Sequence, residues 1–491
     1  MIPLLRRVAR FFFPIEKHEL AKFMPTFFIF FILALVYDML RSLKSSLVVA
    51  EASIGAEVIP YIKVWAMLPG AFIFTTAYLY LASKFTREKT FYIMMSFFVA
   101  FFVFFLLFLY PNRNALEGTL LAELASRWLP SGVRGFGVML QSWPQTLFYV
   151  FTELWGAILL STVFWGFANE VNTISEAKRF YPFYLMGANL AAIVAGRMGV
   201  SISNLTYNPG LPYGETAWDQ ALFYFLLTTI IGGLAVMGLF RWLHWRELVN
   251  PGSNQSLHRG EKIKLALGES FSYLRRSPHL LFIALLVLSY NTIFNLSDIL
   301  WMDQLKMRYQ NNVSGMMEHM SEVTTVTGIL AFFISLLVSG NLLRYAGWRF
   351  TALVTPVALA LTAGAFYFFL LANSCSWAEI IRESVCRVDT AMILWIGALQ
   401  MSVSRGCKYT VFDTSKEIAY IPLSIQEQRY GKAAIDGVGS RFGKSLGSLV
   451  YHVLFFCCAS ITDTVPYVAL IICVIFLVWF FAIFRLARYV D

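Results

Sequence analysis

Charged residues interrupt several long apolar stretches of this sequence, and their types suit the binding of an anion. A charge near the centre of a bilayer costs roughly 2.5–3.5 kcal/mol on insertion scales, so each one is expected to have a partner or a function. Lysine and arginine bind phosphate oxygens well, and here they outnumber the carboxylates. We therefore predict a cavity that attracts a multiply charged anion, lined by Arg41, Lys44, Lys63, Arg197, Arg441 and Lys444 with Glu153, Asp298 and Asp436 among them.

The first apolar stretch ends in a regular charge pattern, "VYDMLRSLKSSLVV". Asp38, Arg41 and Lys44 are spaced by three, which places all three near one face of a helix. Asp38 is therefore expected to form an ion pair with Arg41.

Two explanations stay open for the individual charges. For Arg41, Asp298 and Asp389, which lie near expected helix ends, structural ion pairs or contact with the membrane interface are as good an explanation as function. Glu153 and Lys444 lie further from the ends, which favours a water-filled cavity.

The stretch "GVGSRFGKS" ends in the Gly-Lys-Ser of a phosphate-binding loop, but it does not complete that pattern. The loop requires glycine where this chain has Val438. On a helix, the glycines instead form a ridge spaced by four that lets another helix approach closely. We predict a membrane helix that packs on Gly439, Gly443 and Gly447 and presents Lys444 to a phosphate.

No convincing catalytic centre is visible. The six histidines have no metal-ligand spacing, and the G-x-S-x-G match around Ser445 lies in an apolar helix, where that pattern has no meaning. Nucleotide hydrolysis would also need a Mg²⁺ site and a positioned water. We expect no enzyme activity, no catalytic residues, no cofactor and no metal. Cys375 and Cys386 share a loop and could pair if that loop is periplasmic.

The composition is that of a membrane protein. The 491 residues are 58% hydrophobic and 14% charged, with 46 phenylalanines, whereas a soluble protein has about 25% charged residues. A spanning helix needs about 20 apolar residues. The sequence predicts an all-α protein with twelve such helices, near 24–41, 60–82, 91–110, 144–168, 181–201, 220–240, 279–301, 323–343, 349–372, 388–404, 432–458 and 465–485.

The lysines and arginines support this topology. With both termini in the cytoplasm, 26 of them lie on the cytoplasmic side and 7 on the outer side, as the positive-inside rule requires. The net charge of +10 is thus sorted by side of the membrane, and nucleic acid is not expected as a partner. The longest basic connection, a cytoplasmic linker at 241–278, divides the chain into two major-facilitator-like halves of six helices each, 24–240 and 279–491. A basic amphipathic N-terminus, 1–23, precedes the first half.

Six stretches carry a resemblance to a known family. The sequence resembles the nucleotide transporters of the ATP:ADP antiporter family, found in plastids and in obligate intracellular bacteria. The resemblance runs in order over nearly the whole chain, in "RSLKSSLVVA" (41–50), "IPYIKVWAMLPG" (59–70), "ELWGAILLSTVFWGFANEV" (153–171), "EAKRFYPFYLMGANLA" (176–191), "KYTVFDTSKEIAYIPL" (408–423) and "GKAAIDGVGSRFGKSLG" (431–447).

This resemblance implies a twelve-helix carrier in which four charges matter most for transport: Lys44, Glu153, Asp298 and Lys444. The lysines would attract phosphate, and the carboxylates would either gate the path or partner the lysines. Arg41, Lys63, Arg197 and Arg441 are added from the charge argument. An aromatic platform for the base is also expected near these residues, from among Trp65, Trp155 and Tyr290, although packing explains each of them individually.

Two departures from the family pattern leave the substrate open. Ser45 stands where many ATP:ADP exchangers have an acidic residue, and Asp298 replaces a glutamate. Nucleotide exchange is the main expectation, with proton-coupled triphosphate import or NAD/ADP exchange as alternatives. A carrier of a non-nucleotide organic anion is the alternative from another class.

The expected carrier works by alternating access, as a monomer in a bacterial inner membrane. An empty cavity rich in lysines would be costly to occlude, because its charges repel one another and lose water. A polyphosphate would neutralise them, which favours exchange over one-way transport.

Overall fold

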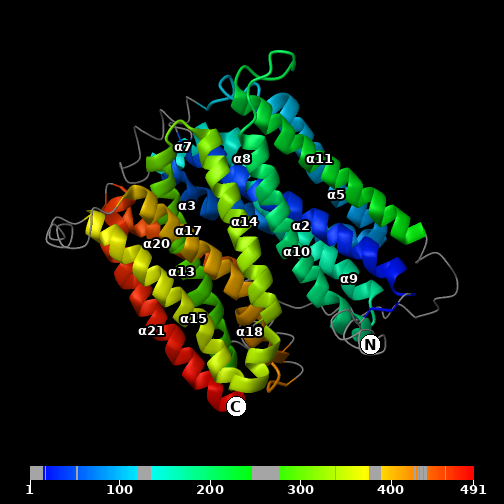
Figure 1. The fold of residues 1–491 in the computed structure, drawn as a ribbon, viewed down its shortest axis with the longest axis vertical. Helices are drawn as coiled ribbons and strands as arrows, with labels where there is room; N and C mark the ends of the chain where they lie inside the picture. The colour runs from blue at the N-terminus through cyan, green and yellow to red at the C-terminus, as the bar shows by residue number, and fades with distance from the viewer. Residues whose placement is uncertain are drawn as a thin grey trace, which may run out of the picture.

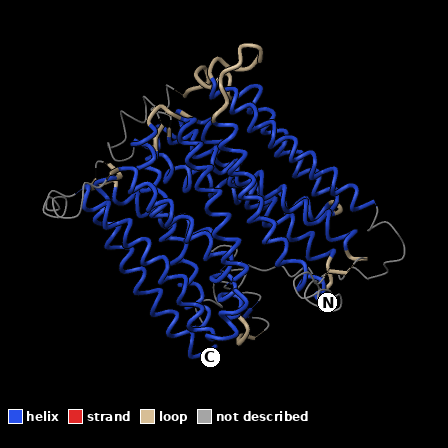
Figure 2. The backbone as a smooth tube through the Cα atoms, in the orientation of Figure 1, coloured by secondary structure: helices blue, strands red, loops and turns tan. Residues whose placement is uncertain are grey.

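The computed structural model describes residues 15–490 except 17, 51–53, 119–133, 246–276, 338, 375–388, 425–426, 429–430, 432–434, 436–439 and 459. The described residues form helices and connecting turns without any strand, as Figure 2 shows. Helix is the expected form for this composition, because a segment in hydrocarbon must satisfy its backbone hydrogen bonds internally. The predicted all-α class is therefore confirmed. Most of the basic linker, Asp436 and the pair Cys375 and Cys386 lie outside the described residues.

Among the described residues, nine helical segments are long and apolar enough to cross a membrane. They match expected spans one to seven, nine and twelve. In chain order they are built from α2 (Leu20–Val49); η1 (Ala56–Val58), α3 (Ile59–Tyr61), η2 (Ile62–Met67) and α4 (Leu68–Lys84); α5 (Arg87–Phe104) and η3 (Phe105–Leu109); α8 (Trp143–Leu154), η5 (Trp155–Phe164) and α9 (Trp165–Val171); α10 (Ile174–Ser203); α11 (Ala217–Leu243); α13 (Pro278–Tyr309); the part of α15 (Ser339–Ser374) that follows Gly347; and η10 (Thr462–Thr464) with α21 (Val465–Val490).

The other three expected spans coincide with helices that are not among these nine. These are α14 (Val313–Leu337), α17 (Thr390–Cys407) with its continuation η8 (Lys408–Phe412) and α18 (Asp413–Ala419), and α20 (Ser440–Leu454). A total of twelve spanning helices thus stays a prediction. The short helix α7 (Arg134–Gln141) precedes α8.

Local sequence signals set several helix ends. Thr173 and Thr216 begin α10 and α11 with capping boxes, in which Glu176 and Asp219 bond back to the cap. Asp389, one of the charges expected near a helix end, caps α17 by accepting a hydrogen bond from the Ala391 amide at 3.3 Å. Asp389 therefore has a structural role at the start of its helix.

Two of the expected boundaries that are wrong concern Lys44 and the cations that follow position 404. The first span was expected to end at 41, but α2 continues to Val49 and so includes Lys44. The tenth was expected to end at 404, but the helix continues through η8 and α18 to Ala419. Arg405 and Lys408, counted with a cytoplasmic loop, therefore lie inside a continuous helical segment. In both cases the charged residues lower the local hydropathy, so the expected span ends before the helix does.

The helices form one bundle in which α2 is central (Figure 1). α2 packs against α8, α10, α11 and α14, and α13 packs against α17, α20 and α21. Among the described elements, the most extensive contact joins α10, which precedes the linker, to α14, which follows it. The helices from before and after the linker diverge toward the end of the bundle at which α2 begins and α21 ends (Figures 1 and 2).

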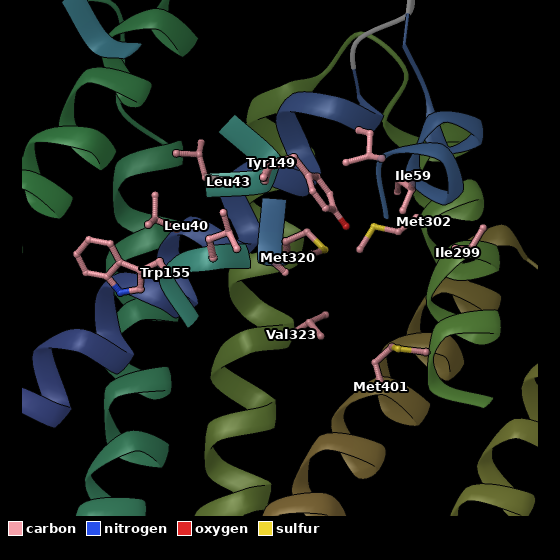
Figure 3. Close-up of a cluster of buried hydrophobic side chains, with 14 of the residues drawn as sticks. Leu40, Leu43, Ile59, Tyr149, Trp155, Ile299, Met302, Met320, Val323 and Met401 are labelled. Atoms are coloured by element: carbon pink, nitrogen blue, oxygen red, sulfur yellow. The ribbon is translucent and has the colours of Figure 1, made fainter. Parts of the chain in front are cut away.

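A buried hydrophobic cluster joins helices from both sides of the linker (Figure 3). The residues that the figure labels come from α2, α3, α8, η5, α13, α14 and α17, and they include Leu43, Tyr149, Met302, Met320 and Met401. Three of the ten labelled residues are methionines, which are unbranched and adapt to changed neighbours. The cluster therefore suits an interface that has to repack.

Candidate functional site

Two ion pairs link four of the residues that the sequence analysis selected. Lys44 of α2 donates to the Glu153 carboxylate of α8, and Lys63 of η2 lies 3.1 Å from the Asp298 carboxylate of α13. At most 18% of any of these four side chains is exposed. Charges held this deeply are stable only when paired, since each loses most of its hydration. We call these four residues the ion-pair cluster.

The two pairs belong to one electrostatic unit. The charges of Lys63 and Asp298 both act on Lys44, and the Lys44 ammonium lies over the Tyr149 ring, 3.7 Å from its centre. An aromatic face attracts a cation without neutralising it. The Lys44 ammonium is thus held in place while its charge stays available to a stronger anion.

A third ion pair lies on α2, between the start of that helix and the ion-pair cluster. Arg41 and Asp38 are 3.0 Å apart, as their spacing predicted. At 1.5 Å of rise per residue, Asp38 lies about 9 Å from Lys44 along the helix, toward the end where the helices diverge. Ser45, the departure from the acidic family residue, is buried and donates to the Arg41 carbonyl at 3.2 Å.

Arg197 does not join the cluster. Its side chain is exposed on α10, and no ion pair within the described part of the chain ties it to the four residues. The side chains of Arg441 and Lys444 lie outside the described residues, so their proposed contacts with substrate stay predictions.

The glycine ridge of α20 is present where the structure describes it. A Cβ at Gly443 would come within 3.0 Å of the Asn291 Cβ, and one at Gly447 within 3.0 Å of the Asn295 Cβ. Ser448 adds a hydrogen bond to the Asn295 side chain at 3.3 Å. The predicted close approach is therefore confirmed for these two glycines, and α13 is the partner helix. Gly439 lies outside the described residues.

The expected aromatic platform is not supported for two of its three candidates. Trp155 is fully buried and donates its ring N–H to the Leu33 carbonyl at 3.2 Å. Tyr290 is also buried, and its hydroxyl is hydrogen-bonded to Ser404. Both rings pack inside the protein, where a base could not stack on them. Trp65 is 58% exposed on η2.

Sequence reasoning missed two cations on the tenth expected span. The Arg405 guanidinium lies 5.5 Å from the centre of the Phe294 ring, and the Lys408 ammonium lies 5.4 Å from that of Tyr290. Both were assigned to a loop because the charges lowered the local hydropathy. The signal that could have found them is the apolar and β-branched "YTVF" that follows Lys408 and continues the helix.

Wider helical turns accompany three of these charged positions. The π-helical segments η2 and η8 contain Lys63 and Lys408, and η5 begins two residues after Glu153. π-Turns are uncommon inside α-helices and occur frequently at functional sites. The π-helical segments and the buried charges therefore lie in the same part of the protein. We take the interior between α2, α8, α13 and α17 as the candidate site.

A second group of ion pairs lies at the diverging end of the bundle. Glu19, which is buried just before α2, accepts two hydrogen bonds from Arg179 of α10, and Lys22 lies 2.8 Å from Glu176. The Arg179 hydrogen bonds hold the pKa of Glu19 below its ordinary value, although burial opposes the shift. These pairs connect the starts of α2 and α10. Among the described residues, no group of three or more His, Cys, Asp or Glu could hold a metal ion.

An all-helical bundle with buried ion pairs between apolar membrane-length helices has the architecture of a multi-pass membrane protein. The model of the TLC ATP/ADP transporter family matches residues 4–489. The chain belongs to this family.

Three named relatives align with nearly the whole chain. It is 37% identical to ADP,ATP carrier protein 1 of Chlamydia muridarum, over 96% of this chain and 89% of that protein. It is 33% identical to ADP,ATP carrier protein 1 of Rickettsia bellii, over 96% and 93%, and 34% identical to the chloroplastic ADP,ATP carrier protein 1 of Arabidopsis thaliana, over 95% and 73%. The family that the sequence resembled is therefore confirmed.

Proposed function

We propose that this chain is a membrane carrier that exchanges ATP and ADP by alternating access. The observation that carries the proposal is the ion-pair cluster, which places two lysines among membrane-length helices in ion pairs with carboxylates that a phosphate could replace. A nucleotide polyphosphate carries more negative charge than a carboxylate and offers more acceptor oxygens. It can therefore replace Glu153 and Asp298 at the two lysines. The names of the relatives favour nucleotides over another organic anion.

The proposed architecture is two six-helix halves, before and after the linker, in a bacterial inner membrane with both termini in the cytoplasm. The described contacts support it, because α10 meets α14 and Lys63 meets Asp298 across that division. Helices that meet at one end and diverge at the other correspond to a carrier closed on one side of the membrane (Figure 1). With this topology, the side at which the helices diverge is the cytoplasm.

The ion pairs change the exchange mechanism expected from the sequence. Lys44 and Lys63 do not repel one another as unpaired charges here, because each has a carboxylate partner. Moving the halves apart on the closed side would instead break Lys63–Asp298, and breaking a buried pair without replacement costs about 3–5 kcal/mol. A bound phosphate supplies the replacement partner for Lys63. Reorientation then requires substrate, which is the basis of exchange.

Uptake by intact bacterial cells expressing the chain tests this function. We expect labelled ATP and ADP to enter only in exchange for internal nucleotide, with other triphosphates and NAD competing less well and a proton uncoupler having no effect. Uptake that stops with the uncoupler would indicate proton coupling instead. Sugar phosphates that inhibit more strongly than nucleotides would contradict a nucleotide carrier.

Lys44→Gln should abolish this uptake, because the glutamine keeps the side chain's bulk but not the charge that attracts phosphate. Lys84→Gln is the matched control, since Lys84 also lies over a tyrosine, 5.5 Å from the Tyr80 ring centre, but on an exposed surface. Its uptake should equal that of the wild type. Near-normal uptake by Lys44→Gln would contradict the role of the cluster.

A further inference from the structure

Tyr61 joins the two sides of the linker at the end of the bundle away from both termini. It lies on α3, which packs against α7 from its own side of the linker and against α20 from the other (Figure 1). Its ring centre is 4.3 Å from that of His452, with the rings edge to face, and the ring is stacked on Phe455 at 6.4 Å. Tyr61 is 2% exposed. These three rings therefore fill the boundary between α3 and α20.

Each partner in this aromatic contact is held by its own side of the linker. The Tyr61 ring rests on the backbone of α7, where a Cβ at Gly135 would come within 2.6 Å of it. On α20, His452 donates from Nδ1 to a carbonyl of its own helix at 2.7 Å, and the neighbouring Tyr451 donates to the Leu296 carbonyl of α13 at 2.9 Å. Each ring therefore moves with its own side, and opening this end of the bundle must break the contact.

Two further contacts across the linker close the same end. The Asn311 N–H, just past α13, donates to the Ala50 carbonyl at the end of α2, at 3.1 Å. The Lys306 side chain covers Gly55, where a Cβ would come within 2.7 Å of the lysine Cε. Glycine suits this position for a second reason, since its φ of +77° is one that other residues rarely adopt. The ends of α2 and α13 are thus joined a few residues before Tyr61.

One helical segment carries both an ion pair of the cluster and the aromatic contact. Tyr61 and Lys63 are two residues apart, and they contact α20 and α13, which pack against each other. A phosphate can replace Asp298 at Lys63, because both are anions. No phosphate can replace His452 and Phe455 at Tyr61, since rings form that contact. The ion pair therefore responds to substrate, whereas the aromatic contact opposes opening whether or not substrate is bound.

We propose that Tyr61 is the outer gate of the carrier, and that its contact with His452 and Phe455 adds to the Lys63–Asp298 pair in keeping the empty carrier from opening to the outside. This gate deepens the proposed function and rests on it. Exchange is obligatory only while the empty carrier does not reorient, so the ring contact has to hold when no phosphate is bound. Phosphate at Lys63 then lowers the cost of opening, because the ion pair no longer has to be broken without a replacement.

Efflux of labelled ADP from liposomes that contain the purified carrier tests this gate, with carrier-free liposomes as the measure of passive leak. The wild type should release ADP rapidly when the medium contains nucleotide and slowly when it does not. Tyr61→Ala should release ADP into nucleotide-free medium on the order of tenfold faster than the wild type, because two aromatic contacts that hold the closed end are lost. Tyr61→Phe keeps the ring and should stay close to the wild type.

Variants on both sides of the linker keep the test independent of one substitution. His452→Ala removes a partner from the other side and should raise the same efflux by a smaller factor, and it carries the test if Tyr61→Ala does not fold. The double variant should gain little over Tyr61→Ala, since both changes break one contact. Phe105→Ala is the matched control, because Phe105 is also buried and its ring centre lies 4.5 Å from that of Phe148, but both precede the linker. It should lower the Tm without raising efflux into nucleotide-free medium.

The outcomes separate the gate from the proposed function. If the wild type exchanges ADP but folded Tyr61→Ala and His452→Ala release no more ADP than the wild type into nucleotide-free medium, the gate is overturned alone. Equal increases for Tyr61→Ala and Phe105→Ala overturn it as well, because weaker packing anywhere in the bundle would then be sufficient. If the wild type exchanges no nucleotide, the proposed function fails, and the gate with it.

Discussion

At the scale of single residues, the Lys63–Asp298 pair has a different significance from Lys44–Glu153. Lys44 and Glu153 both precede the linker, whereas Lys63 and Asp298 lie on opposite sides of it. The second pair therefore breaks if the proposed halves separate on the closed side, and the first does not. We infer that Lys44 mainly attracts substrate, while Lys63 also couples binding to the conformational change.

Removing one member of the second pair should destabilise the protein more than removing both. Lys63→Gln leaves a nearly buried carboxylate without its cation and is expected to cost about 3 kcal/mol. Adding Asp298→Asn should restore much of that stability but not transport, because the phosphate ligand is still missing. The Tm of the three purified variants measures the coupling. A Tm for Lys63→Gln equal to that of the wild type would show that the pair does not stabilise this conformation.

At the scale of helices, the close contact of α10 with α14 depends on glycines at the points where the two helices meet. A Cβ at Gly196 would come within 2.5 Å of the Ser321 carbonyl oxygen and 2.7 Å of the Thr325 nitrogen, and one at Gly328 within 2.8 Å of the Asn189 carbonyl oxygen. Backbone atoms cannot move aside as a flexible side chain can. The two helices therefore pack backbone to backbone, as small residues allow in membranes.

Gly196→Ala should consequently lower the Tm and slow exchange by weakening the closed end of the bundle. Helix propensity acts in the opposite direction, since alanine favours a helix over glycine by about 1 kcal/mol. Gly364→Ala in α15 is the matched control, because a Cβ there meets nothing within 4 Å. It should match the wild type or melt at a higher temperature. Equal Tm values and exchange rates for Gly196→Ala and the wild type would refute this account of the helix contact.

At the scale of the whole molecule, the ion pairs at the start of α2 predict how stability depends on pH. Hydrogen bonds from Arg179 hold the pKa of Glu19 below its ordinary value of 4.5. A depressed carboxylate pKa contributes stability above the ordinary pKa, and this contribution is lost as the pH falls through the pKa of the folded protein. Acidification from pH 7 to below 4.5 should therefore weaken the link between α2 and α10.

The variant Glu19→Gln tests this dependence. Its Tm should be lower than that of the wild type at pH 7, and the difference should shrink as the pH falls below the ordinary pKa of a carboxylate. Glu417→Gln serves as a control, because Glu417 also lies in an ion pair, 3.6 Å from the Lys416 ammonium, but its own side chain is exposed. A constant Tm difference between Glu19→Gln and the wild type across this pH range would argue against the role of the Arg179 hydrogen bonds.

The sequence by itself determined the helical class, nine of the expected spans, the family, and the local pair of Arg41 with Asp38. These properties follow from interactions close in the chain: about 20 apolar residues satisfy a bilayer, and charges three positions apart share a helix face. The glycine ridge of α20 could also be predicted from the sequence, because a spacing of four residues places the glycines on one face of a single helix.

Only the tertiary structure decided which lysine forms an ion pair with which carboxylate. Lys44 could have paired with Asp298 and Lys63 with Glu153, since hydropathy and spacing say nothing about partners 109 and 235 residues apart. The burial of Trp155 and Tyr290 was likewise beyond the sequence. These features depend on how helices pack against one another, and that packing is set by contacts between side chains distant in the chain.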